Sequence, residues 1–126
     1  MDIIAYTNKF AEKYNVSLEI LKKFKEKSNW DNKLHWKFQF KLKRGNKSYT
    51  AIFTQSISAN DKKPTLYDIL SCLTIFDPED FEWFCKTYGY DKNKRENKII
   101  YNGCIKEWKA VQRLFGDCLD ELREIS

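Results

Sequence analysis

The clearest local pattern in the chain lies between residues 35 and 57, where apolar and polar positions alternate. Every second residue from Trp36 to Leu42 is apolar, and lysine or glutamine stands at each position between them. This period of two predicts a β-strand with one packed face and one wet, basic face. Gly45-Asn46 follows, and both residues tolerate the positive φ of a tight turn. The pattern therefore predicts a hairpin that pairs Leu42 with Tyr49, Phe40 with Ala51, and Phe38 with Phe53.

The N-terminal part of the chain predicts one helix and contains one ambiguous segment. Residues 3–14 place apolar side chains at helical spacing, which predicts a short amphipathic helix. Residues 16–24 fit two patterns, because their apolar positions alternate like a strand and also repeat like a helix. A hairpin alone is marginally stable, so a third strand from this segment or helices from the second half must cover its aromatic face.

The second half of the chain predicts helices with recognisable start signals. Thr65 followed by Asp68 is typical of a capping box, and Asp77-Pro78 predicts a further helix that Gly89 ends. Apolar residues from Ile100 to Phe115 step by three or four, which predicts a long helix from about residue 93 with one buried stripe. Gly103 inside it predicts a closely packed neighbour. A last short helix is expected over residues 117–125.

Length and composition favour one domain over residues 1–126, with enough apolar residues, 42%, to build a core. The expected fold class is α+β, with an N-terminal helix, a small antiparallel sheet of two or three strands, and a helical C-terminal half packed on the sheet. No apolar run approaches the ~18 residues of a membrane span, and no signal peptide follows Met1. We therefore expect a soluble, cytoplasmic protein with no membrane partner.

Charge is divided unevenly along the chain. Residues 1–63 hold fourteen Lys and Arg against six Asp and Glu, whereas residues 64–126 hold nine against twelve. A basic half favours an anionic partner. Two groups of basic residues are the candidates for binding such a partner. The first lies on the solvent-exposed face of the hairpin and at its turn: Lys37, Lys41, Lys43, Arg44 and Lys47. The second lies at the start of the long helix: Lys92, Lys94, Arg95 and Lys98. Lysines on a sheet also prevent aggregation, so that alternative stays open.

The sequence contains no recognisable motif for nucleotide or metal-dependent catalysis, so we expect no catalytic residue, no metal site and no cofactor. His35 is the only histidine, and it is expected to be a surface side chain at a strand edge. Asp91, Asn93 and Arg95 imitate the start of a calcium loop, but Glu96 replaces its glycine, so Asp91 or Asn93 is expected to cap the long helix instead. The acidic residues from Asp77 to Glu82 are explained by capping and the helix dipole.

The four cysteines stand far apart, with no C-x-x-C pair among them. Free cysteine is among the most buried residue types, and a zinc site would need closely spaced ligands. Buried, reduced thiols are therefore the expected state of Cys72, Cys85, Cys104 and Cys118.

One run of residues resembles a known group of proteins. It contains Pro64-Thr65, Asp68-Ile69-Leu70, Cys72-Leu73, Phe81, Phe84-Cys85, Gly89-Tyr90-Asp91 and Arg95. With the preceding hairpin, residues 34–115 resemble a widespread set of small proteins from phages, prophages and plasmids. Their looser match at the N-terminus favours a strand over residues 16–24. The resemblance implies an accessory or anti-defence role.

Two functions from different classes follow from the resemblance and the charge. The first is a non-enzymatic phage anti-defence protein, an anti-CRISPR inhibitor that binds an RNA-guided effector, protein or ribonucleoprotein, in the host cytoplasm. The alternative is a phage accessory protein that binds single-stranded nucleic acid through lysines and aromatic rings. Binding to naked DNA or RNA that weakens steeply with salt would favour the alternative.

Overall fold

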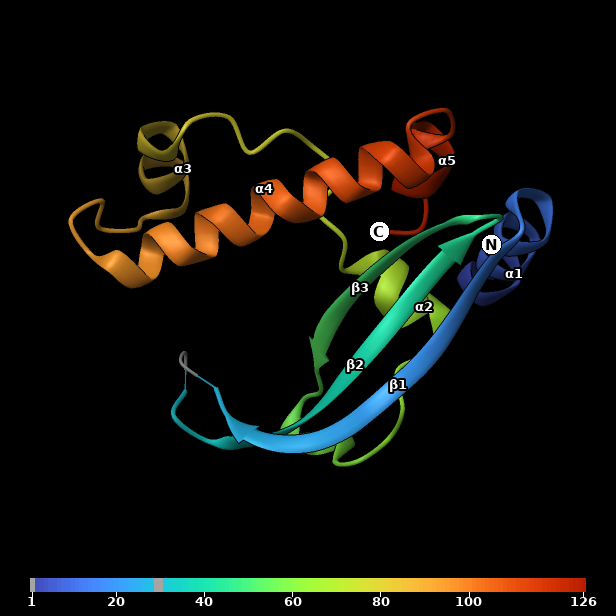
Figure 1. The fold of residues 1–126 in the computed structure, drawn as a ribbon, viewed down its shortest axis with the longest axis horizontal. Helices are drawn as coiled ribbons and strands as arrows, with labels where there is room; N and C mark the ends of the chain where they lie inside the picture. The colour runs from blue at the N-terminus through green and yellow to red at the C-terminus, as the bar shows by residue number, and fades with distance from the viewer. Residues whose placement is uncertain (1, 29–30) are drawn as a thin grey trace.

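The computed structural model describes residues 2–28 and 31–126 and has the α+β architecture expected from the sequence (Figure 1). A helix precedes a three-stranded sheet, and the remaining helices follow it. The elements are α1 (Ile3–Tyr14), β1 (Val16–Lys27), β2 (Leu34–Arg44), β3 (Lys47–Thr54), the 3₁₀ turn η1 (Ile57–Ala59), α2 (Leu66–Ser71), α3 (Phe81–Tyr88), α4 (Arg95–Phe115) and α5 (Leu119–Arg123).

The sheet is antiparallel with the order β1-β2-β3, so β2 is central. The hairpin register is confirmed, since Phe40 lies opposite Ala51 and Phe38 opposite Phe53. Gly45 supplies the positive φ of the turn, at 58°. The ambiguous segment is a strand, and it extends to Lys27, past the predicted end.

A bulge in β1 changes which face its side chains occupy. Ile20 pairs with Phe40, but Lys22 rather than Leu21 pairs with Gln39. The extra residue shifts the alternation by one position, so Lys23 and Lys25 lie on the same face as Phe38 and Trp36. Lysines of β1 therefore reach the packed face of the sheet at its far end, away from the hairpin turn.

The core lies on the face of the sheet formed by Phe40 and Leu42, against α1, α2, α5 and the C-terminal half of α4. Phe10 of α1 contacts Phe115 of α4 with ring centroids 5.9 Å apart. Both rings are nearly or completely buried, which is where aromatic side chains stabilise most. The helical second half therefore covers the aromatic face, as expected.

The sequence predicts the start of one helix in the second half correctly and the start of another wrongly. The capping box of α2 is confirmed, because Thr65 accepts from the Asp68 amide and Asp68 accepts from the Thr65 amide. The predicted start of α3 at Asp77-Pro78 is wrong. Glu79 has a φ of 56°, in the left-handed region, which no right-handed helix can contain, so α3 begins after Asp80. Gly89 ends α3 as predicted, with a φ of 74°.

The long helix α4 departs from prediction in its first half. Its N-cap residue is Lys94, with no side-chain cap, and Asp91 instead accepts from the amide of Asn93. The predicted stripe is buried only near the C-terminal end, and Ile100 is 42% exposed. The close neighbour expected at Gly103 is absent from the described part of the chain, because apart from the helix's own backbone no atom there lies within 4 Å of a Cβ built on Gly103. The cause is that the N-terminal half of α4 extends past the sheet (Figure 1).

Candidate functional site

The outer face of the sheet is less basic and less exposed to solvent than the alternation predicts. It carries Lys37, Lys41 and Lys43. Only 14% of the Lys37 side chain is exposed, and its ammonium lies 3.1 Å from the carboxylate of Glu26. Lys41 is half-buried and stands opposite Glu19 across the β1–β2 pair, whereas Lys43 is exposed. Two of the three lysines thus have acidic neighbours on the sheet itself.

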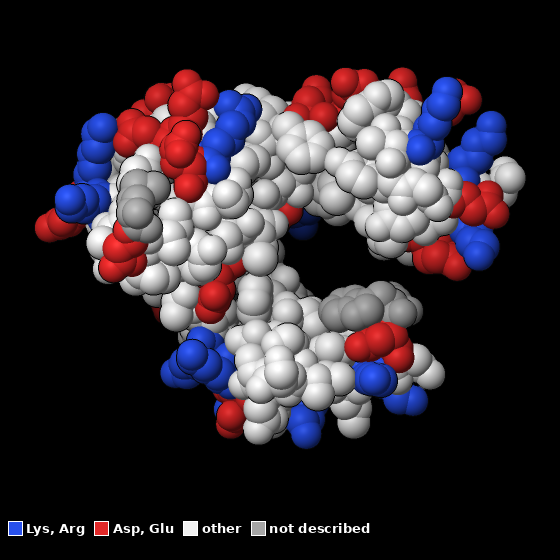
Figure 2. Space-filling model, turned by 180° about the vertical axis from the view of Figure 1, so that it is seen from behind, with Lys and Arg blue, Asp and Glu red and all other residues white. Residues whose placement is uncertain are grey.

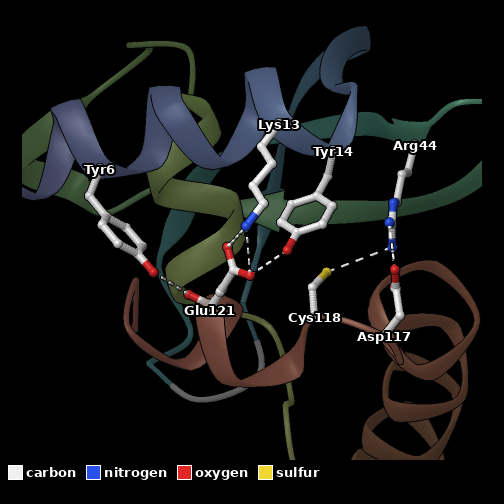
Figure 3. Close-up of polar contacts among 7 residues, drawn as sticks. All are labelled: Tyr6, Lys13, Tyr14, Arg44, Asp117, Cys118 and Glu121. Atoms are coloured by element: carbon white, nitrogen blue, oxygen red, sulfur yellow. Dashed lines mark hydrogen bonds and ion pairs between the residues drawn. The ribbon is translucent and has the colours of Figure 1, made fainter.

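Arg44 fastens the hairpin turn to the C-terminal helices (Figure 3). Its guanidinium donates to the carbonyl of Leu114 at 2.7 Å and to both carboxylate oxygens of Asp117, and it lies over the ring of Tyr14 at 4.8 Å. The bond from Arg44 lowers the pKa of Asp117 to about 2, and the same bond raises the pKa of Arg44. The charge of Arg44 is therefore used inside the fold.

A neighbouring polar cluster joins α1 to α5 on the same side of the molecule (Figure 3). Glu121 accepts from the Lys13 ammonium at 3.2 Å and from the Tyr14 hydroxyl, while its backbone carbonyl accepts from Tyr6. Hydrogen bonds from Tyr14 and Lys13 lower the pKa of the Glu121 carboxyl. Lys47, the last candidate at the turn, donates to the carbonyl of Arg113 at 3.3 Å and is exposed.

The second candidate group lies at the opposite end of α4 from the hairpin turn. Lys94 and Arg95 are exposed there, and Lys92 lies 3.9 Å from Glu82. The Lys98 ammonium lies over the rings of Phe81 and Tyr101, at 4.5 and 5.0 Å. A 21-residue helix spans about 30 Å, so this group lies far from the turn residues Arg44 and Lys47, and of the first group only Lys37 lines a cleft shared with the start of α4.

The strongest concentration of lysines lies outside the two groups that the sequence pattern predicts. It lies at the far end of the sheet, and we call it the basic end: Lys22, Lys23, Lys25, Lys27, Lys33, Lys62 and Lys63. Lysines project from the same lobe in Figure 2. Three acidic residues share this end, namely Glu26, Asp31 and Asp61. The repeated lysines between residues 22 and 27 are visible in the sequence and indicate a basic surface. Because this segment fits both a strand and a helix, its pattern does not show on which face those lysines lie.

Aromatic rings lie among the lysines of the basic end. The ammonium groups of Lys23 and Lys25 lie 4.6 and 5.1 Å from the ring centroid of Trp36. Trp36 is half-buried, so part of its side chain faces solvent. On the outer face, Lys22 lies 5.4 Å from the ring of Phe24. Each ring is a cation–π partner for a lysine, which keeps the ammonium groups close to aromatic surface.

His35 holds the basic end together and is not the surface side chain that its strand-edge position predicts. It is 5% exposed, and its two ring nitrogens lie 2.8 Å from the Gln55 carbonyl and 2.7 Å from an Asp31 carboxylate oxygen. Gln55 continues the chain of bonds by donating to the Lys62 carbonyl at 2.8 Å. The bonds to Gln55 and Asp31 raise the pKa of His35.

A cleft of about 460 Å³ separates the far end of the sheet from the N-terminal half of α4. Figure 2 shows the molecule hollowed between these two parts. Lys37 lines the cleft from the sheet, and Tyr90 and Ile100 line it from the helical side. The buried hydroxyl of Ser28, also in its lining, has no hydrogen-bond partner among the described residues.

The thiols are free but not uniformly buried. None of the four cysteines is bonded to another, and Cys85 and Cys118 are buried as expected. Cys72 is exposed, because it follows the last residue of the short helix α2, and Cys104 is half-buried. Among residues 2–28 and 31–126, no group of three or more His, Cys, Asp and Glu side chains is placed to hold a metal ion.

Comparisons with protein families, with curated proteins and with solved structures find no match to this chain. The resemblance of residues 34–115 to small proteins of mobile elements therefore stays a prediction. In the described part of the chain, no helix has the length and apolar character needed to cross a membrane.

Proposed function

We propose that this protein is a non-enzymatic, phage-encoded anti-defence protein that binds and inhibits an RNA-guided bacterial effector, as an anti-CRISPR protein does. The inhibitor acts in the host cytoplasm. It docks on an anionic surface of the effector, which is either nucleic acid held by the effector or an acidic patch of its protein.

The observation that carries the docking part of the proposal is the basic end. Seven lysines lie there against three acidic residues, and each of those three acids already has a partner: Glu26 with Lys37, Asp31 with His35, and Asp61 with Lys23. Most of the lysine charge is left to act on a partner. A dense positive surface of this kind raises the association rate with an anionic partner and weakens as salt increases. The anti-defence part is supported by the resemblance alone.

The proposal is tested by inhibition of a purified effector. Tagged protein is first used to recover partners from a host lysate, and an RNA-guided effector found there is then purified and assayed for target cleavage. Cleavage should fall as the protein is added in increasing amounts. An effector that cuts its target at full rate with the protein in excess contradicts the proposal.

Three charge-reversal variants locate the docking surface. The first changes Lys22, Lys25 and Lys27 of the basic end to glutamate, and the second changes Lys37, Lys41 and Lys43 of the outer face. The third changes the group at the start of α4, namely Lys92, Lys94, Arg95 and Lys98. The basic-end variant should lose most inhibition, because in the described part of the chain none of its three lysines takes part in an ion pair. The charges changed in the first and third variants are exposed, and exposed charges change stability by only about 0.5 kcal/mol each, so circular dichroism should show that these two proteins fold. The second variant also breaks the Lys37–Glu26 pair, so its stability is measured beside its inhibition.

A second candidate is a phage accessory protein whose main ligand is single-stranded nucleic acid. The position of Trp36 beside Lys23 and Lys25 favours it, because lysines can follow phosphates while a ring stacks on a base. Tight binding to a naked strand, with no effector recovered or inhibited, would replace the anti-defence proposal with this one.

A further inference from the structure

We infer that the basic end binds single-stranded nucleic acid, with an unpaired base stacked on Trp36 and the neighbouring phosphates held by Lys23, Lys25 and Lys27. The inference deepens the proposed function, since it names the ligand of the same surface. Its physical basis is charge, the placement of one ring and the shape of the surface.

Charge at the basic end favours a polyanion over a single acidic side chain. Lys22, Lys25 and Lys27 are exposed, and among the described residues none of the three takes part in an ion pair. Alternate residues along a strand are about 6.6 Å apart, so Lys23, Lys25 and Lys27 form a row on the face that carries Trp36, while Lys22 lies on the opposite face. A polynucleotide offers a matching row of regularly spaced negative charges and releases its bound counterions when lysines replace them.

Trp36 supplies the second element of such a site. The β1 bulge places Lys23 and Lys25 on the face of the sheet that carries Trp36, and both ammonium groups lie within about 5 Å of its ring. Lysine side chains are long and flexible, so an approaching strand can draw the ammonium groups to its phosphates and leave the ring for a base. Stacking of a base on an aromatic ring is tolerant of sequence and contributes about 1–3 kcal/mol.

The position of the ring favours a single strand over a duplex. Trp36 belongs to the central strand β2 and is half-buried, with β1 on one side and Gln55 bonded to its carbonyl on the other. A half-buried ring on the face of a sheet stacks most readily on a base that is free to turn out of its own helix. Bases in a duplex are already stacked and paired, whereas those of a single strand can be splayed onto aromatic side chains.

The first test is binding of the unmodified protein to a fluorescent single strand of about 12 nucleotides, followed by anisotropy. Neutralising about four phosphates gives a slope of log affinity against log salt near −3, since each contributes about −0.7 in a single strand. Affinity should then fall roughly 50-fold between about 50 and about 200 mM salt. A duplex of the same length should bind more weakly. A salt slope near zero, or a preference for the duplex, would overturn the inference.

The second test uses matched variants of the protein. Lys23→Glu with Lys25→Glu should abolish most strand binding, whereas Lys41→Glu with Lys43→Glu makes the same change of charge on the outer face and should retain most of it. Trp36→Leu should weaken binding at least five-fold, and Trp36→Phe should restore part of the loss. Equal affinity for the two charge-reversed proteins would overturn the assignment of the site. Because the salt slope is measured on the unmodified protein, the inference remains testable if a variant does not fold.

Strand binding and effector inhibition are scored separately. If the protein binds a naked strand but inhibits no effector, the inference stands and the anti-defence proposal fails. If it inhibits an effector but binds no strand, the inference fails, and the basic end docks on an acidic protein surface instead.

Discussion

His35 is the one side chain at the basic end that titrates near neutral pH, and it is the only histidine in the chain. Hydrogen bonds to the Gln55 carbonyl and to Asp31 raise its pKa above the ordinary value of about 6.5. A raised pKa in the folded state means that the stabilisation is fully present below about pH 6.5 and is lost as pH rises through the folded pKa. We expect the free energy of unfolding to fall between about pH 6 and about pH 8.

Urea denaturation across this pH range measures the effect. His35→Gln should be less stable than the unmodified protein at the acidic end and should lose the pH dependence, since no other side chain of the chain ordinarily titrates there. An unchanged pH profile in His35→Gln would contradict the assigned role of the bonds to Gln55 and Asp31.

The thiols differ in burial, and this predicts an order of chemical reactivity. Cys72 is exposed, while Cys85 and Cys118 are each 4% exposed. Burial raises the pKa of Cys118 to about 11 and also raises the pKa of Cys104. Since the thiolate is the reactive form, a thiol reagent should label one cysteine rapidly in the folded protein.

Replacing Cys72 with serine identifies that thiol, because the rapid phase should disappear. All four cysteines should react after denaturation. Neither a mild reductant nor a chelator should change the melting temperature, and a drop of several degrees with either would reveal a disulfide or a metal.

Residue type alone does not distinguish basic side chains that can bind a partner from those that are bonded to other parts of the same chain. Arg44 follows Lys43 in the sequence as one more basic residue, yet it is bonded to Leu114 and Asp117, seventy residues or more away. Lys37 is likewise paired with Glu26. Such pairings depend on which distant segments meet, and a single sequence does not contain that information in its local pattern.

At the scale of elements, α4 starts without a side-chain cap. Lys94 is its N-cap residue, and a positive charge at that position also opposes the helix dipole. Lys94→Ser would supply a hydroxyl that accepts from a free amide of the first turn and would remove the opposing charge. The free energy of unfolding should rise by about 1 kcal/mol.

Lys92→Ser is the matched control, because it removes the same charge outside the helix and creates no cap. Urea denaturation of both variants separates capping from charge. A Lys94→Ser protein no more stable than Lys92→Ser would show that α4 does not need the cap.

Strict alternation and capping residues predict elements well, because they are local. The hairpin register and the capping box of α2 agree with the sequence for this reason. The bulge after Ile20 could not be predicted, since it is a shift in the pairing of β1 with β2 and not a feature of the local pattern of β1. The bulge places Lys23 and Lys25 beside Trp36, so the proposed site could not be predicted from the alternation of residues in the sequence.

At the scale of the whole molecule, the structure separates two apolar clusters. The main cluster joins α1, α2, the sheet and the C-terminal half of α4 around Phe115. A second cluster lies beyond it, where Phe84 of α3 contacts the rings of Tyr90 and Tyr101 at 5.6 and 5.3 Å. The part of the molecule that faces the sheet across the cleft in Figure 2 is therefore held by its own small core.

Separate clusters predict separate unfolding of the α3 region. Phe84 is 4% exposed, and truncating a buried phenylalanine costs about 3–5 kcal/mol. Because the ring contacts of Phe84 are with Tyr88, Tyr90 and Tyr101, in α3, the loop after it and the first turns of α4, Phe84→Ala should open that part alone and leave the main cluster folded. Hydrogen exchange should show faster exchange over Phe81–Tyr88 and unchanged protection in β2.

Phe115→Ala provides the contrast, because the same truncation in the main cluster should lower protection in β2 together with the helices. Strand binding gives the decisive second measurement on Phe84→Ala. The basic end lies on the sheet, across the cleft from α3, so a protein with an opened α3 region should still bind a single strand with nearly unchanged affinity. Loss of strand binding in Phe84→Ala, with β2 still protected, would mean that the ligand contacts both walls of the cleft.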